Sequence, residues 1–434
     1  MADSAIALSP SRSQRDLASR VLEGAFVVLL LLVYVGLAPF ATRDPHVLAT
    51  GETLTAGEGD LIRQISYLAV FLVIAASAME KASWRAIDAV PISLAALLLW
   101  CALTALWAQE PDITIRRAGL EVVVVLSVML SVQGLGPERS LRLLRHVLAL
   151  VLIVNWLSIP FIHNAIHQPG EVDPGIVGDW RGLYFHKNIT GAVCALSAMV
   201  FLHYALRYRS WTDWALLVGA LGFLVMTRSK SSMALLPLAL GLAGIYRLSM
   251  RNARDRMIAI VVLLLVVLCG AVVLLANADA VMRVLSDPAE FTGRAAIWQA
   301  EIAYIRDHPL LGSGFGSFAD TGALSPLHNY VSENWVQVIS HGHNGYLQLM
   351  MTTGMIGFAL AAIALFAVPA IGFWRTGGMD PDLKALLFAF FAFFIFHNLT
   401  ESDFLESDGA SWVAYLMMLA ALRTETLAPR RLAP

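Results

Sequence analysis

Long apolar stretches separated by short polar intervals run along most of the chain. A helix needs about 20 apolar residues to cross a hydrocarbon core about 30 Å thick, and these stretches are about that long. The pattern predicts an all-α polytopic membrane protein, with residues 1–434 forming a single membrane domain. We expect about twelve transmembrane helices, at residues 21–40, 61–79, 86–107, 118–133, 146–162, 189–206, 211–227, 232–248, 257–276, 346–374, 383–399 and 410–422.

The composition agrees with this class. Hydrophobic residues make up 58% of the 434 residues, charged residues only 14%, and the mean hydropathy is +0.68. Soluble domains carry about 25% charged residues, so membrane lipid is the expected surrounding and a nucleic-acid partner is not expected. All three cysteines lie inside apolar stretches, which makes a disulfide framework or a cysteine-ligated metal site improbable.

The distribution of lysine and arginine predicts the orientation. With the N-terminus in the cytoplasm, 19 of the 30 basic residues fall in cytoplasmic loops, as the positive-inside rule requires. The longest polar interval, residues 277–342, then faces the periplasm of a bacterial inner membrane. A loop of this length is usually functional or disordered, and its helical spacing of apolar residues favours order. We expect it to form a lid and part of the active site.

The basic residues predicted on the outer side oppose the insertion bias, so they call for an explanation. As a set they suit a phosphorylated ligand, because guanidinium groups match phosphate oxygens in pairs. Anchoring to lipid headgroups by long side chains is the alternative. Among these residues are Arg116 and Arg117 at the start of the fourth predicted helix, Arg228 and Lys230 in the tight turn 227–232, and Arg283, Arg294 and Arg306 in the long interval.

A second polar segment, residues 178–191, reads GDWRGLYFHKNITG. Its glycines let the backbone approach a ligand closely. Its polar side chains can donate to an anion or to sugar hydroxyls, and its aromatic rings can stack on a sugar. An aromatic belt with a capped helix start is the structural alternative. The candidates are Trp180, Arg181, Tyr184, His186, Lys187 and Asn188.

Within the long interval, residues 292–306 have the pattern of an amphipathic helix, with Arg294 and Trp298 on one stripe. A Gly-rich turn follows at 308–316. A nucleotide-binding interpretation of this turn is weak because no strand precedes it and no P-loop lysine follows. His328, Glu333, His341 and His343 could form a zinc site, but their spacing matches helical metal motifs poorly.

Three segments of the chain form a combined pattern. They are Trp180-Arg181-Gly182 with His186-Lys187-Asn188, then Thr292-Gly293-Arg294 with Trp298 and Pro309 to Gly314, and His343-Asn344-x-x-Leu347 with Gly354. Together they resemble the O-antigen ligase and Wzy-type polysaccharide polymerase superfamily, and the H-N-x-x-L-x₆-G element is the most specific part. The W-R-G…H-K-N form is more similar to the exopolysaccharide polymerase branch, and Thr400-Glu401-Ser402 is also similar to that branch.

The resemblance implies a glycosyltransferase of the GT-C type that uses an undecaprenyl-diphosphate-linked glycan donor, a glycan or lipid-linked glycan acceptor and no metal cofactor. By analogy with the family's histidine, His343 activates the acceptor hydroxyl, and Glu401 is a rival base. Arg181, Lys187, Arg228 and Arg294 are the diphosphate candidates, with Arg116 and Arg117 behind them and Lys230 and Asn344 as further substrate-binding residues. A polysaccharide flippase and a chain-length regulator are the protein partners it suggests.

Other functions stay open at this stage. A ligase would transfer the glycan to lipid A core, whereas a polymerase, which we favour, would transfer it to another repeat. A polysaccharide or lipid transporter is the rival from another class. Transporters often carry ionisable residues near the bilayer centre, but the apolar stretches here have almost none, and Asn155 is among the few polar exceptions. Glu401, Asp403, Glu406 and Asp408 could also form no more than a solvated turn.

Overall fold

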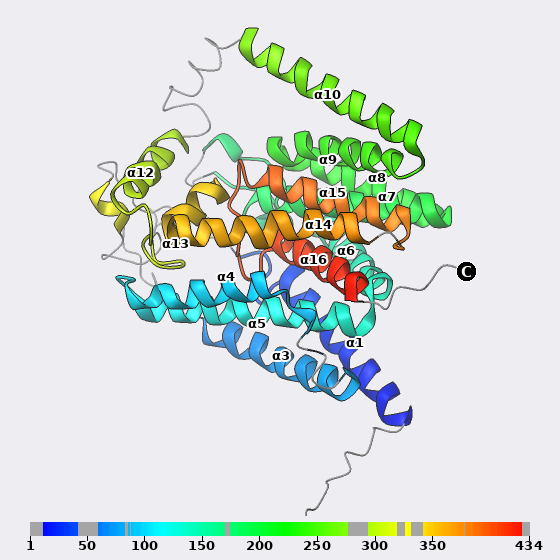
Figure 1. Ribbon diagram of the computed structural model, residues 1–434, viewed down its shortest axis with the longest axis horizontal. Helices are drawn as coiled ribbons and strands as arrows, with labels where there is room; N and C mark the ends of the chain where they lie inside the picture. The colour runs from blue at the N-terminus through cyan, green and yellow to red at the C-terminus, as the bar shows by residue number, and fades with distance from the viewer. Residues whose placement is uncertain are drawn as a thin grey trace, which may run out of the picture.

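The computed structural model describes residues 12–41, 60–82, 86, 88–169, 174–276, 294–318, 326–330, 342–376 and 378–427. Each predicted transmembrane segment overlaps a helix in Figure 1. In chain order the helices are α1 (Arg12–Tyr34), α3 (Leu61–Ala82), α4 (Ile92–Leu103) with η2 (Thr104–Leu106), α5 (Pro111–Leu135), α6 (Pro137–Ser158), α7 (Lys187–Tyr208), α8 (Trp211–Thr227), α9 (Lys230–Ser249), α10 (Ala253–Ala276), α12 (Arg294–Asp307), α13 (Gly345–Ala362), η9 (Ile363–Ala367), α14 (Val368–Arg375), α15 (Pro381–His397) and α16 (Ala410–Leu427).

Seven of the described helical stretches are long and apolar enough, by length and composition, to cross a membrane. They are 16–34, 61–81, 111–135, 137–158, 187–208, 230–249 and the continuous 345–375, while 92–106 and 211–227 are apolar but shorter. The chain is therefore an all-α, multi-pass membrane protein. The full number of twelve crossings remains a prediction.

Short polar residues at the helix starts explain where several helices begin. The side chains of Ser210 and Asp380 accept hydrogen bonds from the first free backbone N–H groups of α8 and α15, which would otherwise lack partners. Prolines occupy the first positions of α5, α6 and α15, where their missing N–H is not needed.

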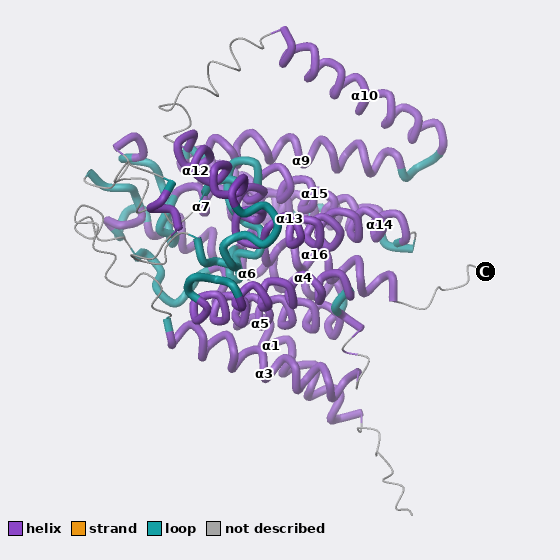
Figure 2. Tube along the Cα trace, turned by 60° about the vertical axis from the view of Figure 1, so that its left-hand side comes forward, coloured by secondary structure: helices purple, strands orange, loops and turns teal. Residues whose placement is uncertain are grey.

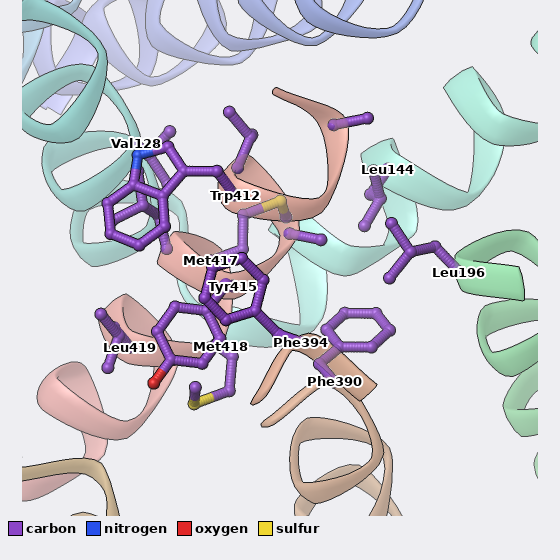
Figure 3. Packing of buried hydrophobic residues seen from close by; sticks show 14 of the residues in the cluster. Val128, Leu144, Leu196, Phe390, Phe394, Trp412, Tyr415, Met417, Met418 and Leu419 are labelled. Atoms are coloured by element: carbon purple, nitrogen blue, oxygen red, sulfur yellow. The ribbon is translucent and has the colours of Figure 1, made fainter. Parts of the chain in front are cut away.

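Helix α16 lies at the centre of the bundle, and every residue from 410 to 422 is buried. Figure 3 shows its Trp412 and Tyr415 packed with Phe394 of α15. The rings of Phe394 and Tyr415 stack with centroids 4.1 Å apart. An apolar surface on all sides is typical of a helix enclosed by others, so α16 is the axis around which α5, α6, α7, α14 and α15 pack.

Helix α12 lies at one end of the bundle beside the start of α13, whereas α10 lies along the outside and packs on α9 (Figures 1 and 2). Residues 277–342, the predicted lid, are described at α12, at 308–318, at η7 (Pro326–Asn329) with Tyr330, and at Gly342. Arg283, Glu333, His341 and the side chain of His328 lie outside the described residues.

Candidate functional site

Glu401 is the residue on which the candidate site converges. Its Oε1 accepts hydrogen bonds from Asn188 Nδ2 at 2.8 Å and from Arg294 Nη2 at 3.0 Å. Its Oε2 lies 3.1 Å from His343 Nδ1. The start of α7, the start of α12 and the segment before α13 thus meet at one carboxylate in the turn between α15 and α16. Glu401 is therefore more than part of a solvated turn.

His343 reaches Glu401 because of the backbone around it. Its φ of 52° is left-handed, and the next residue, Asn344, caps α13 by accepting hydrogen bonds from two backbone N–H groups of that helix at 3.1 Å. The capping role thus belongs to Asn344, and the imidazole of His343 is directed to the carboxylate. With Nδ1 donating to Glu401, the neutral ring keeps a lone pair on Nε2.

The charges around Glu401 hold it ionised. Burial alone would raise its pKa, but the hydrogen bond and charge of His343 together with Arg294 and His397 outweigh burial and lower the pKa to about 2. Cations that hydrogen-bond a carboxylate stabilise its charged form. A permanently ionised Glu401 can fix the tautomer of His343 and stabilise a proton gained by that ring.

His186 lies beside this group and stays uncharged. Burial lowers its pKa to about 3, against an opposing effect of Glu401. Its Nδ1 accepts a hydrogen bond from Asn188 N at 3.2 Å and so caps α7. The proton of the neutral ring must then be on Nε2, which makes this nitrogen a hydrogen-bond donor.

Arg294 and Trp298 attach α12 to the site. Arg294 donates from Nη1 to the carbonyl oxygen of Thr400 at 2.5 Å, in addition to its ion pair with Glu401. Trp298 donates from Nε1 to the carbonyl oxygen of Gly342 at 2.9 Å. Helix α12 therefore binds the backbone of the residue before Glu401 and the backbone of the residue before His343.

One predicted cation of the 178–191 segment and one of the 227–232 turn pair with Asp179. This buried carboxylate pairs with Lys187 Nζ at 2.5 Å and Arg228 Nη1 at 3.2 Å. Lys187 pairs with Asp179, and the next residue, Asn188, donates to Glu401. The ion pairs of Asp179 and the contacts of Glu401 are therefore adjacent along α7. Arg228 is 73% exposed, and it can turn toward a ligand at little cost.

Arg181 has a different environment. It is 2% exposed, and its guanidinium donates from Nε to Asn164 O at 2.6 Å and from Nη1 to Phe185 O at 3.2 Å. These bonds brace the loop that carries His186 and Lys187. Contact between Arg181 and a diphosphate therefore remains a prediction.

The aromatic residues of the 178–191 segment pack inward. Trp180 lies in an edge-to-face cluster with Trp156 and Phe223, at centroid distances of 5.5 and 5.2 Å, and Tyr184 donates to the carbonyl oxygen of Tyr34 at 2.7 Å. These contacts explain why aromatic residues occur here without a sugar. Sugar stacking by Trp180 stays a prediction.

The remaining predicted residues lie on α5, at the start of α9 and directly before α13. Arg117 on α5 donates to the carbonyl oxygen of Gly316, and Arg116 is half-buried on the same turn. Lys230 is exposed at the first residue of α9. Asn344, beyond its capping role, donates to Leu399 O at 3.4 Å. None of these contacts is with Glu401.

Helix α13 breaks at Gly354, the glycine of the histidine motif. The backbone there has φ 67° and ψ −178°, a conformation open to glycine and strained for other residues. A Cβ at this position would lie 2.1 Å from the carbonyl oxygen of Leu310. The glycine therefore allows the Gly-rich turn to lie directly on the helix backbone.

The Gly-rich turn supplies the hydrogen bonds that the break removes from α13. Backbone groups pair across the two segments: Ser313 N with Met351 O and Gly314 N with Thr352 O, both at 3.0 Å, and Met355 N with Pro309 O at 2.9 Å. Two motifs that lie far apart in the sequence are thus one structural unit. The glycines serve this close backbone packing.

Sequence reasoning missed two acidic residues near the site. Asp179 lies inside the quoted GDWRG motif, but no local pattern showed that it would pair with two cations. Glu301 lies on α12 two turns after Arg294, and this helical spacing was the one signal that it faces the same way. Both are buried.

These features define the class of the protein: a multi-pass membrane protein that gathers histidine, glutamate, arginine and asparagine side chains at one end of its bundle. Residues 215–362 match the family model described as O-antigen ligase. This part of the chain is similar to the O-antigen ligase family, and the match supports the resemblance that the motifs predicted. The match includes Arg294 and the segment from His343 to Gly354, whereas Glu401 lies beyond it. No curated protein matches the chain.

Proposed function

We propose that the chain is a membrane glycosyltransferase that joins undecaprenyl-diphosphate-linked oligosaccharide repeats to a sugar hydroxyl, as a polymerase in exopolysaccharide or O-antigen assembly. The observation that carries this proposal is the contact of His343, Arg294 and Asn188 with the single carboxylate of Glu401. The family match adds the chemical context.

In the proposed reaction His343 is the base. Its Nε2 takes the proton of the acceptor hydroxyl while the hydroxyl oxygen bonds to the anomeric carbon of the donor sugar. The bond between that carbon and the diphosphate oxygen breaks, and undecaprenyl diphosphate leaves. Glu401 acts as the partner that orients the imidazole and stabilises its positive charge. Both oxygens of Glu401 are already hydrogen-bonded, which favours this assignment over Glu401 as the base.

The leaving diphosphate gains one negative charge when its bond to the anomeric carbon breaks, and side-chain cations can stabilise that charge without a metal ion. Lys187 lies in the first turn of α7, where the helix dipole also favours an anion. Arg228 is close by and exposed, and Arg181 lies beneath the same loop. In this proposal the phosphate oxygens take over part of the pairing that Asp179 now provides.

The proposal also includes the location. The bias of basic residues toward one side supports an inner-membrane protein with this site facing the periplasm. A donor lipid would reach the site from the outer leaflet after a flippase has delivered it, and a chain-length regulator would act on the product. Residues 277–342 would then cover the site as a lid.

Reconstitution tests this function. Purified protein in liposomes should convert a lipid-linked repeat unit into longer lipid-linked glycan with no energy source, whereas a transporter would leave the glycan length unchanged. His343→Ala should abolish the reaction at unchanged protein level and unchanged thermal unfolding temperature. Retained polymer in this variant would remove His343 from the mechanism.

Glycan analysis of a deletion strain separates the two enzyme types. Accumulated single repeat units on the carrier lipid are expected for a polymerase. Long chains that remain unattached to lipid A core would instead identify a ligase, and would overturn the polymerase assignment.

A further inference from the structure

Glu301 is a buried carboxyl group that the proposed mechanism does not use. It is 1% exposed, and its Oε2 has no hydrogen-bond partner. A Cβ on Gly342 would lie 1.9 Å from Glu301 Oε1, so the carboxyl lies directly against the backbone that precedes His343. Trp298, one turn earlier on α12, holds the same backbone by its hydrogen bond to Gly342 O.

Packing does not explain an acidic residue at this position. The neighbours of Glu301 on α12, namely Ile297, Ala300 and Tyr304, are all buried, and an apolar side chain would suit them. A buried polar group without a partner destabilises the fold, and such groups in native proteins call for an explanation. A ligand that is bound during the reaction would supply the missing partner.

We propose that Glu301 binds the diphosphate of the lipid-linked donor, donating the O–H of its neutral carboxylic acid to a phosphate oxygen beside His343. This inference rests on the proposed function, because it assigns a contact within that same site. It also extends the cationic group: Lys187 and Arg228 would offset charge, while Glu301 would add a directed hydrogen bond from the α12 side.

The environment keeps this carboxyl protonated. Burial raises the pKa of Glu301 to about 8. Other titratable groups lie on α12 itself (Arg294, Tyr304, Arg306 and Asp307), in the segment before α13 (His343) and at the start of α13 (Tyr346). At pH 7 the group can donate a hydrogen bond, whereas above pH 8 it becomes an anion that repels phosphate.

Binding of a short polyprenyl diphosphate, farnesyl diphosphate, to purified full-length protein tests this inference without requiring glycosyl transfer. The protonated fraction of a group with a pKa of about 8 falls about tenfold between pH 7 and pH 9, so the wild-type affinity should fall by about that factor. Glu301→Gln should bind at pH 7 within about threefold of wild type and lose little affinity at pH 9, because its amide cannot ionise. The ionisation of the diphosphate itself affects both proteins equally.

Gln299→Glu is the matched control, since it places a carboxyl on the exposed face of the same helix and should leave the pH dependence as in wild type. An equal affinity of the wild type at pH 7 and pH 9 would overturn the inference even if Glu301→Gln does not fold. Phosphatidylglycerol is tested in parallel, and competition with the same pH dependence would assign the group to a lipid headgroup instead. Protein that neither binds diphosphate nor extends glycan would overturn the proposed function itself.

Discussion

Glu401 Oε2 and His343 Nδ1 lie 3.1 Å apart although 58 residues separate them in the chain. The carboxylate also accepts from Arg294 and Asn188, so the imidazole is held by a group that is itself fixed from two further helices. A histidine held in one tautomer in this way can act as a base from the opposite nitrogen.

Replacing Glu401 by glutamine should lower polymer formation by about 100-fold, the scale of an impaired acid–base group. The amide keeps the shape and can still accept from Asn188, but it no longer stabilises a protonated His343. Polymer yield per purified protein in liposomes measures the effect. Activity within twofold of wild type would show that the pair of His343 and Glu401 has no catalytic role.

The same variant gives a test by pH. Because the pKa of Glu401 is lowered to about 2 from an ordinary value of 4.5, its ionised form stabilises the fold above pH 4.5, and this stabilisation disappears as the pH falls toward 2. The difference in thermal unfolding temperature between wild type and Glu401→Gln should therefore shrink as the pH falls below about 4.5. A difference that stays unchanged from pH 5 down to pH 3 would contradict this pKa.

Arg294 contacts Thr400 O and Glu401 with two different nitrogens, and lysine cannot reproduce this forked geometry. Arg294→Lys should lower activity about tenfold or more, while protein yield stays close to that of wild type. Arg306→Lys, on the exposed last turn of the same helix, is the control and should change activity less than twofold. Equal effects at the two positions would mean that charge alone matters.

Gly354→Ala should destabilise the protein by about 3 kcal/mol or more. The alanine would have to keep a positive φ, which is strained, and its Cβ would clash with the Leu310 carbonyl oxygen. Gly244→Ala is the control: this glycine lies within α9 with no atom near an added Cβ, and alanine there should be neutral or stabilising by up to about 1 kcal/mol. Thermal unfolding in detergent compares them. An equally stable Gly354→Ala protein would contradict the close contact between α13 and the Gly-rich turn.

Variants at Asp179 and at Arg228, which pairs with it, can distinguish charges that stabilise the fold from charges that bind a ligand. Asp179→Asn should destabilise the fold by about 3 kcal/mol, because it leaves Lys187 partly buried without its counter-ion. Arg228→Ala should change stability by less than about 1 kcal/mol, since Arg228 is 73% exposed, but should weaken binding of farnesyl diphosphate. Unfolding temperature and diphosphate affinity are measured on both variants. Unchanged affinity in Arg228→Ala would remove that residue from the diphosphate site.

The helices could be predicted from the sequence because about 20 apolar residues in a row have few other structures open to them. The boundaries were less accurate. Helix α5 begins at Pro111, seven residues before the predicted start, since its first two turns are helical but polar. Hydropathy detects the lipid-facing part of a helix and misses its ends.

The residues of the candidate site could be predicted where they belong to a sequence motif. The contacts that join distant segments at the site could not. His343, Arg294 and Glu401 could be selected from the family motifs, but the motifs say nothing of the bonds between them. Trp180 illustrates the limit: a tryptophan in a polar segment suggests sugar stacking, whereas its ring packs edge to face with Trp156 and Phe223. Such partners are set by the packing of α6 and α8.

The backbone contact between the Gly-rich turn and the break in α13 limits which segments of this protein can be exchanged with those of related proteins. Residues 309–314 and 351–356 share their backbone hydrogen bonds, and this contact depends on Gly312 and Gly354, where a Cβ would meet the other segment's backbone. An exchanged segment with a larger residue at either position would separate the two backbones and leave carbonyl and amide groups unpaired. In a chimera designed to change glycan specificity, the two segments should therefore be exchanged together.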